Sequence, residues 1–123
     1  MLMDKKILIV DDDPRNIFAL KLTLKARGYA VESCTMAQEA LEILKSHPQF
    51  SVVLMDMMMP GIDGYEAVRM IRNTQEIKHI PVIAVTAQAM PEDRQKCLEA
   101  GADEYVSKPI DVDLLIMAIE KLS

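Results

Sequence analysis

Five short apolar segments, each followed by a longer segment of helical periodicity, constrain the fold of this chain more than any other feature. The apolar segments predict strands at residues 6–10, 29–33, 50–55, 80–85 and 103–106. Helices are expected over 13–28, 35–45, 63–73, 91–101 and 111–122. Near-continuous Val, Ile and Leu in the first, third and fourth strands indicates parallel strands covered on both faces. The sequence therefore predicts an α/β fold, a three-layer (βα)5 sandwich around a five-stranded parallel sheet.

Local signals set the expected ends of the helices. Asp13 is suited to cap the first helix, because Pro14 then occupies the first helical position. The spacing of Thr35 and Gln38 predicts a capping box at the second helix. Further signals are Asp63 with Glu66 and Pro91 as helix starts, Gly28 and Gly101 as helix ends, and Leu115, Ala118, Ile119 and Leu122 as the apolar stripe of the last helix.

Length and composition exclude several classes of function. A chain of 123 residues fits one domain, 1–123, and half of its residues are hydrophobic. No apolar run reaches the roughly 18 residues of a membrane span, and the N-terminus lacks a secretory signal, so we expect a cytoplasmic protein without membrane insertion. A net charge of −5 argues against direct nucleic-acid binding. Cys34 and Cys97 are expected to be reduced, small, buried side chains.

Polar residues follow four of the predicted strands. Asp11, Asp12 and Asp13 follow the first, Asp56 the third and Thr86 the fourth, and the fifth is followed by Ser107, Lys108 and Pro109. Singly, each has an ordinary explanation as a solvated turn, a strand end or a surface cation. In open α/β sheets, however, the carboxyl ends of parallel strands form the binding crevice. Carboxylates crowded there repel by about 4 kcal/mol per pair at 4 Å, so a cation is expected among them.

The residue types at these strand ends indicate the chemistry. Aspartate oxygens without histidine or thiol suit Mg²⁺, with Mn²⁺ as the alternative, and such ions often bind beside a phosphate. Lys108 and the Thr86 hydroxyl are suited to hold phosphoryl oxygens. Asp56 is then left as a nucleophile, and its attack on a phosphoryl group gives an aspartyl phosphate.

Four segments in this order, "ILIVDDD", "LMDMMMPGIDG", "VIAVTA" and "YVSKP", resemble the receiver domains of two-component signalling, the chemotaxis-type response regulators. The resemblance covers essentially the whole chain and implies a flavodoxin-like sheet of order 2-1-3-4-5. It implies a switch that takes a phosphoryl group from a histidine kinase or a histidine phosphotransfer protein. Such a domain is no conventional turnover enzyme, although it catalyses its own phosphotransfer and slow self-dephosphorylation.

The resemblance also implies roles for individual residues. Asp56 matches the phosphoacceptor, and Mg²⁺ would be held by Asp11, Asp12, Asp56 and the Met58 carbonyl, with Asp11 acting through a water. Thr86, Lys108 and the main-chain amides of Met57 and Ala87 would bind phosphoryl oxygens. Tyr105 matches the aromatic switch, and a cis peptide is expected before Pro109. The output face, on the fourth helix, fifth strand and fifth helix, would include Lys96, Glu99, Glu104, Tyr105, Ile116 and Glu120.

Two positions depart from the usual pattern of relatives. Met58 stands two residues after Asp56, where many relatives carry a polar group, and Gln88 stands two after Thr86. We therefore hypothesise that Met58 slows loss of the phosphoryl group.

Other interpretations stay open at the level of sequence. A haloacid dehalogenase-like phosphatase is weakened by Met58, because that family has an acid at this position. A phosphorylation-independent interaction module would be indicated by a missing Asp, Thr or Lys. The chain would be either a stand-alone shuttle or a receiver excised from a larger protein, and its motifs resemble receivers of hybrid histidine kinases.

Overall fold

The computed structural model describes residues 5–59, 61, 63–87 and 90–122. Strands and helices alternate throughout this part of the chain, as the pattern predicts. The strands are β1 Lys6–Val10, β2 Ala30–Cys34, β3 Val52–Asp56, β4 Val82–Thr86 and β5 Glu104–Ser107. The helices are α1 Pro14–Ala26, α2 Ala37–Ser46, α3 Gly64–Arg72, α4 Pro91–Ala100 and α5 Val112–Leu122.

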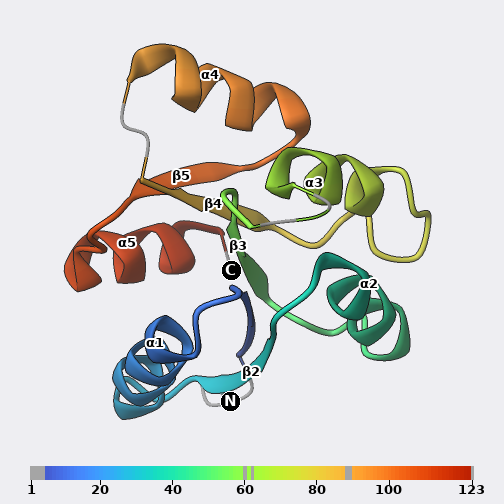
Figure 1. The fold of residues 1–123 in the computed structure, drawn as a ribbon. Helices are drawn as coiled ribbons and strands as arrows, with labels where there is room; N and C mark the ends of the chain where they lie inside the picture. Colours follow the sequence, from blue (N-terminus) through green and yellow to red (C-terminus); the bar gives the residue numbers. More distant parts are fainter. Residues whose placement is uncertain (1–4, 60, 62, 88–89, 123) are drawn as a thin grey trace.

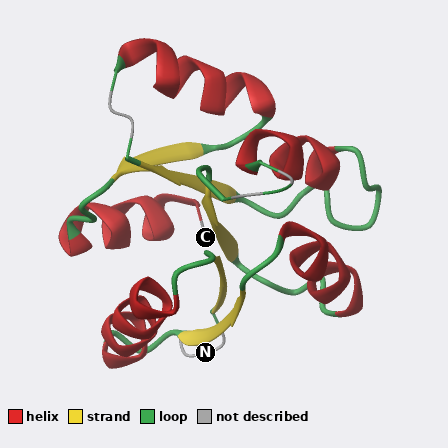
Figure 2. Cartoon of the chain, in the orientation of Figure 1, coloured by secondary structure: helices red, strands yellow, loops and turns green. Residues whose placement is uncertain are grey.

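The five strands form one parallel sheet in the order β2-β1-β3-β4-β5, which confirms the expected topology. Figure 1 shows α1 and α5 on one face of the sheet and α2, α3 and α4 on the other. Figure 2 shows the strands as the middle layer between helices. Because strand order reverses between β1 and β3, the crevice expected for ligands lies at the carboxyl ends of these strands.

The sheet buries side chains on both faces. Every residue of β3 and β4 is buried, which explains their continuous apolar sequences. Alternate residues of each strand enter different clusters: Leu8 and Val10 pack with α2, α3 and α4, whereas Ile7 and Ile9 pack with α1 and α5. The edge strand β2 is more exposed and starts one residue later than predicted. Two apolar cores therefore cover the two faces of the sheet, and the polar residues stand at the carboxyl ends of its strands.

Most predicted helix caps are present. The Asp13 carboxylate accepts the Arg15 amide, and the Asp63 carboxylate accepts the Glu66 amide at 2.8 Å. The predicted capping box at Thr35 is wrong. The N-cap of α2 is Met36, without a side-chain hydrogen bond, and the backbone there is still extended. The Asp11 amide donates to the Cys34 carbonyl at 3.2 Å, which holds the end of β2 against the end of β1. This tertiary contact favours an extended chain up to Met36, one residue later than the local motif predicts for the helix start.

Arg72, at the end of α3, ties together three segments. Its guanidinium donates to the carbonyls of Gly101 and Ile80 at 2.8 and 2.7 Å and to the Asp103 carboxylate at 2.6 Å. Gly101 has φ +120°, and a Cβ there would lie 2.7 Å from Arg72 Cγ, so glycine is required for this approach. The same Asp103 oxygen accepts the Val82 amide at 2.9 Å. Arg72 thus fastens the start of β4 and the turn between α4 and β5 to α3.

Replacing Arg72 with methionine is expected to lower the free energy of unfolding by about 3 kcal/mol. The change removes the charged donor of the Asp103 carboxylate and leaves the carbonyl of the buried Ile80 without the hydrogen bond from Arg72. Urea denaturation followed by circular dichroism measures the loss, and Arg69→Met on the exposed face of α3 is the matched control. Equal midpoints for the two variants would contradict this role of Arg72.

The cysteines match the expectation of buried, unpaired thiols. Cys34 and Cys97 are both free and buried. Burial raises the pKa of the Cys34 thiol to about 11, so the unreactive thiol form dominates at neutral pH.

The helices are short. Among the residues that the structure describes, none forms a helix with the length and apolar character that a membrane crossing requires.

Candidate functional site

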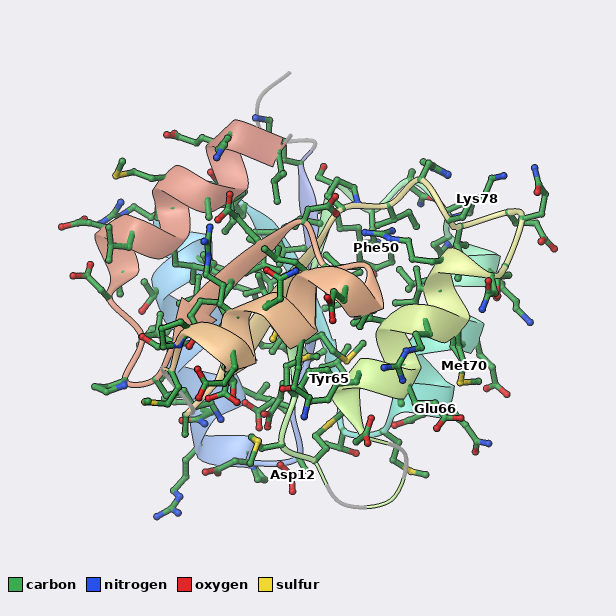
Figure 3. The ribbon with its side chains drawn as sticks, turned by 90° about the horizontal axis from the view of Figure 1, so that it is seen from above. Asp12, Phe50, Tyr65, Glu66, Met70 and Lys78 are labelled. Atoms are coloured by element: carbon green, nitrogen blue, oxygen red, sulfur yellow. The ribbon has the colours of Figure 1, made fainter. Side chains whose placement is uncertain are left out.

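The polar residues predicted to meet do meet at one edge of the sheet. Asp11 and Asp12 follow β1, Asp56 ends β3, Thr86 ends β4 and Lys108 follows β5. These strands are neighbours in the sheet, and the register pairs Asp56 with Val85 and Thr86 with Ser107. Figure 3 shows Asp12 toward one end of the molecule and Phe50, which precedes β3, toward the other. The fold itself therefore brings together side chains that are up to 97 positions apart, from Asp11 to Lys108.

Three carboxylates form the centre of the site. Ligand oxygens of Asp11, Asp12 and Asp56 all lie within 4.8 Å of one another, which is a spacing suited to one metal ion. Asp11 and Asp56 are buried at 4% exposure each, whereas Asp12 is exposed. Burial raises the pKa of the Asp11 carboxyl, the Asp13 amide opposes this by donating to it at 2.8 Å, and the Asp56 charge raises it further. The carboxylates of the cluster thus repel one another, and burial adds to the cost of their negative charge.

Lys108 supplies positive charge to this set. Its Nζ lies 3.6 Å from Asp56 Oδ2 and 3.9 Å from Asp11 Oδ2, with a side chain that is 25% exposed. Its amide donates to the Thr86 carbonyl at 2.8 Å, which fastens the segment to β4. The peptide between Lys108 and Pro109 is cis, as expected.

The main-chain amide of Met57, which was expected to bind a phosphoryl oxygen, has a different partner in the structure. The Met57 amide donates to the Val85 carbonyl at 2.9 Å and so extends the sheet, instead of facing the carboxylate. The amide that does reach Asp56 is that of Met58, which donates to Oδ1 at 3.0 Å. The Met57 amide is therefore paired within the sheet, and the Met58 amide is the one that contacts the Asp56 carboxylate.

The residues expected to sense the phosphoryl group lie on the adjacent strands. Thr86 is fully buried, and Ala87 beside it is exposed. Tyr105 pairs with Ala84 in the register and is half-buried, packed against the core on the α4 side of the sheet. Gln88, the second departure from the usual pattern, is outside the described residues, as is Pro60 in the motif after Asp56.

The expected output face needs one correction. Ile116 is buried at 9% exposure in the core beneath α5, so it cannot be part of an exposed surface. The apolar residues that α5 exposes are Leu114 and Met117, at 58% and 63%. Lys96, Glu99 and Glu120 are exposed as expected, and Glu104 and Tyr105 are half-buried. Leu114 and Met117 also line a groove with Glu104, Tyr105, Asp111 and Lys121.

Two contributors to the site were missed by the sequence argument. Asn16, on the first turn of α1, donates to Asp11 Oδ2 at 3.4 Å. Gly64, the first residue of α3, lets the helix approach the loop closely, because a Cβ there would lie 2.4 Å from Met57 Cα and 2.9 Å from the Asp56 carbonyl oxygen. A polar residue on the first turn after a strand-end acid, and a glycine at a helix start, are the only signals that the sequence carries for them.

The comparisons with known proteins agree with this geometry. The family model of the response regulator receiver domain matches residues 7–120. The polar-differentiation response regulator DivK of Brucella ovis is 35% identical over 118 residues, covering 96% of this chain and 95% of DivK. A probable cyclic di-GMP phosphodiesterase of Vibrio cholerae is 42% identical over 109 residues, covering 89% of this chain but only 24% of that protein. The chain therefore spans about a quarter of the second relative.

Solved structures extend the comparison to the fold and the site. The receiver domain of the sensor histidine kinase PA1611 of Pseudomonas aeruginosa, described with magnesium coordinated in the active site cleft, matches with TM-score 0.87 and 32% identity over 97% of each chain. The receiver domain of the Saccharomyces cerevisiae response regulator Ssk1, solved with the phosphotransfer protein Ypd1, matches with TM-score 0.88 and 25% identity over 97% of this chain and 88% of that one. The chain belongs to the response regulator receiver domains of two-component signal transduction.

Proposed function

We propose that residues 1–123 act as one receiver domain that takes a phosphoryl group onto Asp56 and passes the signal on by protein contact. The observation that carries the proposal is the convergence of Asp11, Asp12 and Asp56 within 4.8 Å, with Lys108 Nζ 3.6 Å from Asp56. Carboxylates gathered in this way need a cation, and a carboxylate held beside cations is suited to attack phosphorus.

Each residue has a role that follows from its position. An Asp56 carboxylate oxygen attacks phosphorus, the new O–P bond forms, and the bond to the donor's leaving group breaks. Lys108 balances charge on a phosphoryl oxygen, since its ammonium already lies beside Asp56. The Met58 amide, 3.0 Å from Asp56, and the Ala87 amide donate to the remaining oxygens. The buried Thr86 hydroxyl then binds the phosphoryl group and reports its presence.

The donor set fits Mg²⁺, with Mn²⁺ as the alternative. Three aspartate carboxylates, one of them exposed to water, offer the hard oxygen ligands that these ions prefer. Asp12, Asp56 and the Met58 carbonyl would hold the ion directly, and Asp11 would act through a water. When bound, the ion neutralises charge on the phosphoryl oxygens. The magnesium described in the Pseudomonas aeruginosa receiver supports this assignment.

The partners follow from the same chemistry. We infer that the donor is a phosphohistidine on a histidine kinase or on a phosphotransfer protein, as the Ypd1–Ssk1 pair suggests. We propose that Thr86 and Tyr105 couple the phosphoryl group to the face of α4, β5 and α5, where a downstream protein binds. Two or three charged hydrogen bonds of roughly 1.5–3 kcal/mol each suffice for the approximately 5.5 kcal/mol that reverses a 1:99 equilibrium.

The other interpretations are less well supported. The haloacid dehalogenase alternative is not favoured, because the receiver family matches residues 7–120 and Met58 stands where that alternative needs an acid. A phosphorylation-independent module has no need of the residues that cluster at Asp56, yet all of them are present. Both stand-alone regulators and parts of larger signalling proteins occur among the matches, and we propose a cytoplasmic site of action for either form.

Acetyl phosphate provides the test of the proposed function. Intact-mass measurement is expected to show the addition of one phosphoryl group in the presence of Mg²⁺ and little or none in EDTA. Mn²⁺ should restore the adduct after EDTA is removed by exchange. An adduct of equal amount with and without a divalent ion would contradict the role of the carboxylate cluster, and no adduct in either condition would contradict phosphorylation itself.

Replacing Met58 with asparagine is expected to shorten the life of the phosphoryl group by about five- to tenfold. The Met58 main chain contacts Asp56, and an amide side chain at this position can orient the attacking water with one hydrogen bond worth about 0.5–1.5 kcal/mol. Loss of the adduct is followed by intact mass after acetyl phosphate is removed. A Met58→Leu variant controls for the change of side chain without added polarity. Equal half-lives for asparagine and leucine would contradict the shielding role of Met58.

A further inference from the structure

Exposed methionines occur in three of the loops that follow the strands. Among the described residues, Met36, Met58 and Met90 are 56%, 49% and 58% exposed, and they lie in the loops that follow β2, β3 and β4. Thioethers differ from aliphatic side chains in one respect that matters here: they are oxidised to sulfoxides.

Within the run of three methionines after Asp56, exposure is confined to the middle one. Met57 is 2% exposed and Met59 is 6% exposed, whereas Met58 is 49% exposed. Met57 extends the sheet by its bond to Val85 and packs against Gly64, which fixes it in the interior. An oxidant in solution therefore reaches the Met58 sulfur and is kept from the sulfurs on either side.

Met58 is also the exposed methionine whose main chain forms a hydrogen bond with Asp56. Its amide donates to Asp56 Oδ1 at 3.0 Å, so its Cα lies within about 4.5 Å of that oxygen. A change in the polarity of its side chain is thus a change in the surroundings of the group attached to Asp56. Met117, at 63% exposure on α5, has no such position and serves as a matched reference.

We propose that Met58 is an oxidation-sensitive modification site that shortens the life of the phosphoryl group on Asp56 when peroxide-class oxidants convert it to the sulfoxide. The proposal rests on the phosphorylation of Asp56 put forward above. In the modification, the Met58 sulfur attacks one oxygen of hydrogen peroxide. The S–O bond forms as the O–O bond breaks, and the second oxygen leaves as water after proton transfer. Sulfur loses two electrons and peroxide gains them.

The direction of the effect follows from the polarity of the product. A thioether accepts hydrogen bonds weakly, whereas a sulfoxide oxygen is a polar acceptor that can hold a water molecule. Water held beside the phosphoryl group hydrolyses it more readily, so oxidation removes the shield that Met58 provides. One such hydrogen bond corresponds to a rate increase of about fivefold. Sulfoxide reductases reverse the modification, which makes it suited to a reversible redox input.

The experiment compares each protein with itself before and after oxidation. The full chain is treated with hydrogen peroxide, freed of peroxide by catalase, mapped by peptide mass, and phosphorylated with acetyl phosphate and Mg²⁺. We expect sulfoxide at Met58 with Met57 and Met59 intact, and a half-life of the adduct shortened about fivefold. Treatment with sulfoxide reductases should restore the half-life. The ratio of the adduct's half-life before oxidation to its half-life after oxidation should be near one in Met58→Leu. In Met117→Leu this ratio should equal that of the parent.

The outcomes separate this proposal from the proposed function. No adduct on untreated protein overturns phosphorylation of Asp56 and, with it, the redox input. An adduct whose half-life is unchanged by oxidation of Met58 overturns the redox input alone. The same holds if peroxide shortens the half-life equally in Met58→Leu, or if Met57 and Met59 oxidise as fast as Met58. A Met58→Gln variant, which carries a permanent amide acceptor, should match the oxidised parent without peroxide.

Discussion

Asp56→Asn is expected to abolish the phosphoryl adduct that acetyl phosphate and Mg²⁺ produce. An amide is a poor nucleophile at phosphorus, and its substitution also removes one of the three metal-facing carboxylates. The change is nearly isosteric and keeps an oxygen that can accept the Met58 amide. Intact mass measures the adduct, and we expect none above the background of the parent in EDTA.

A neighbouring aspartate provides the matched control. Asp13 caps α1 through the Arg15 amide and is not part of the carboxylate cluster, and asparagine caps helices about as well as aspartate. Asp13→Asn should therefore retain the adduct. Asp56→Asn should also be at least as resistant to urea in EDTA as the parent, because it relieves repulsion among crowded charges. An adduct of parental amount on Asp56→Asn would refute Asp56 as the acceptor.

Lys108→Met is expected to slow phosphorylation by about 10²–10³-fold, the usual effect of removing one group that stabilises transition-state charge. The ammonium lies 3.6 Å from Asp56 Oδ2, at the place where phosphoryl oxygens gather charge as the new bond forms. Methionine preserves the length of the aliphatic chain and removes only the charge. The initial rate of adduct formation with acetyl phosphate and Mg²⁺ is the measurement.

Lys121→Met is the matched control for this loss. Lys121 pairs with Glu104 at 3.0 Å on the exposed side of α5, and its side chain is 72% exposed. Its removal changes the net charge of the protein equally but leaves the strand-end cluster intact. We expect Lys121→Met to form the adduct at the rate of the parent. If Lys108→Met also formed the adduct at that rate, Lys108 would take no part in the transfer.

The sequence contains enough information to predict the sheet but not every detail of its edges. The hydrophobic runs of β1, β3 and β4 are buried on both faces, so their composition alone identifies them. The start of α2 could not be predicted in this way. Thr35 has the right local spacing for a cap, but the bond from the Asp11 amide to Cys34 is a tertiary contact that local patterns do not carry.

The site was predictable because parallel strands deliver their ends to one edge, so Asp11, Asp56, Thr86 and Lys108 converge whatever their separation in sequence. Burial around α5 was harder. The helix is apolar on more than one face, and only packing against the sheet distinguishes the buried Ile116 from the exposed Met117. The contacts of Arg72 were beyond prediction, because its main partners are backbone carbonyls as far as 29 residues away.

The identity of the acceptor residue is the central claim, and chemical mapping tests it most directly. Borohydride reduces an acyl phosphate to an alcohol and so converts an aspartyl phosphate into homoserine at the modified position. After reaction with acetyl phosphate and Mg²⁺, peptide sequencing by mass is expected to find homoserine at position 56. Homoserine at Asp11 or Asp12, or at no aspartate of a protein that carries the phosphoryl mass, would contradict the account.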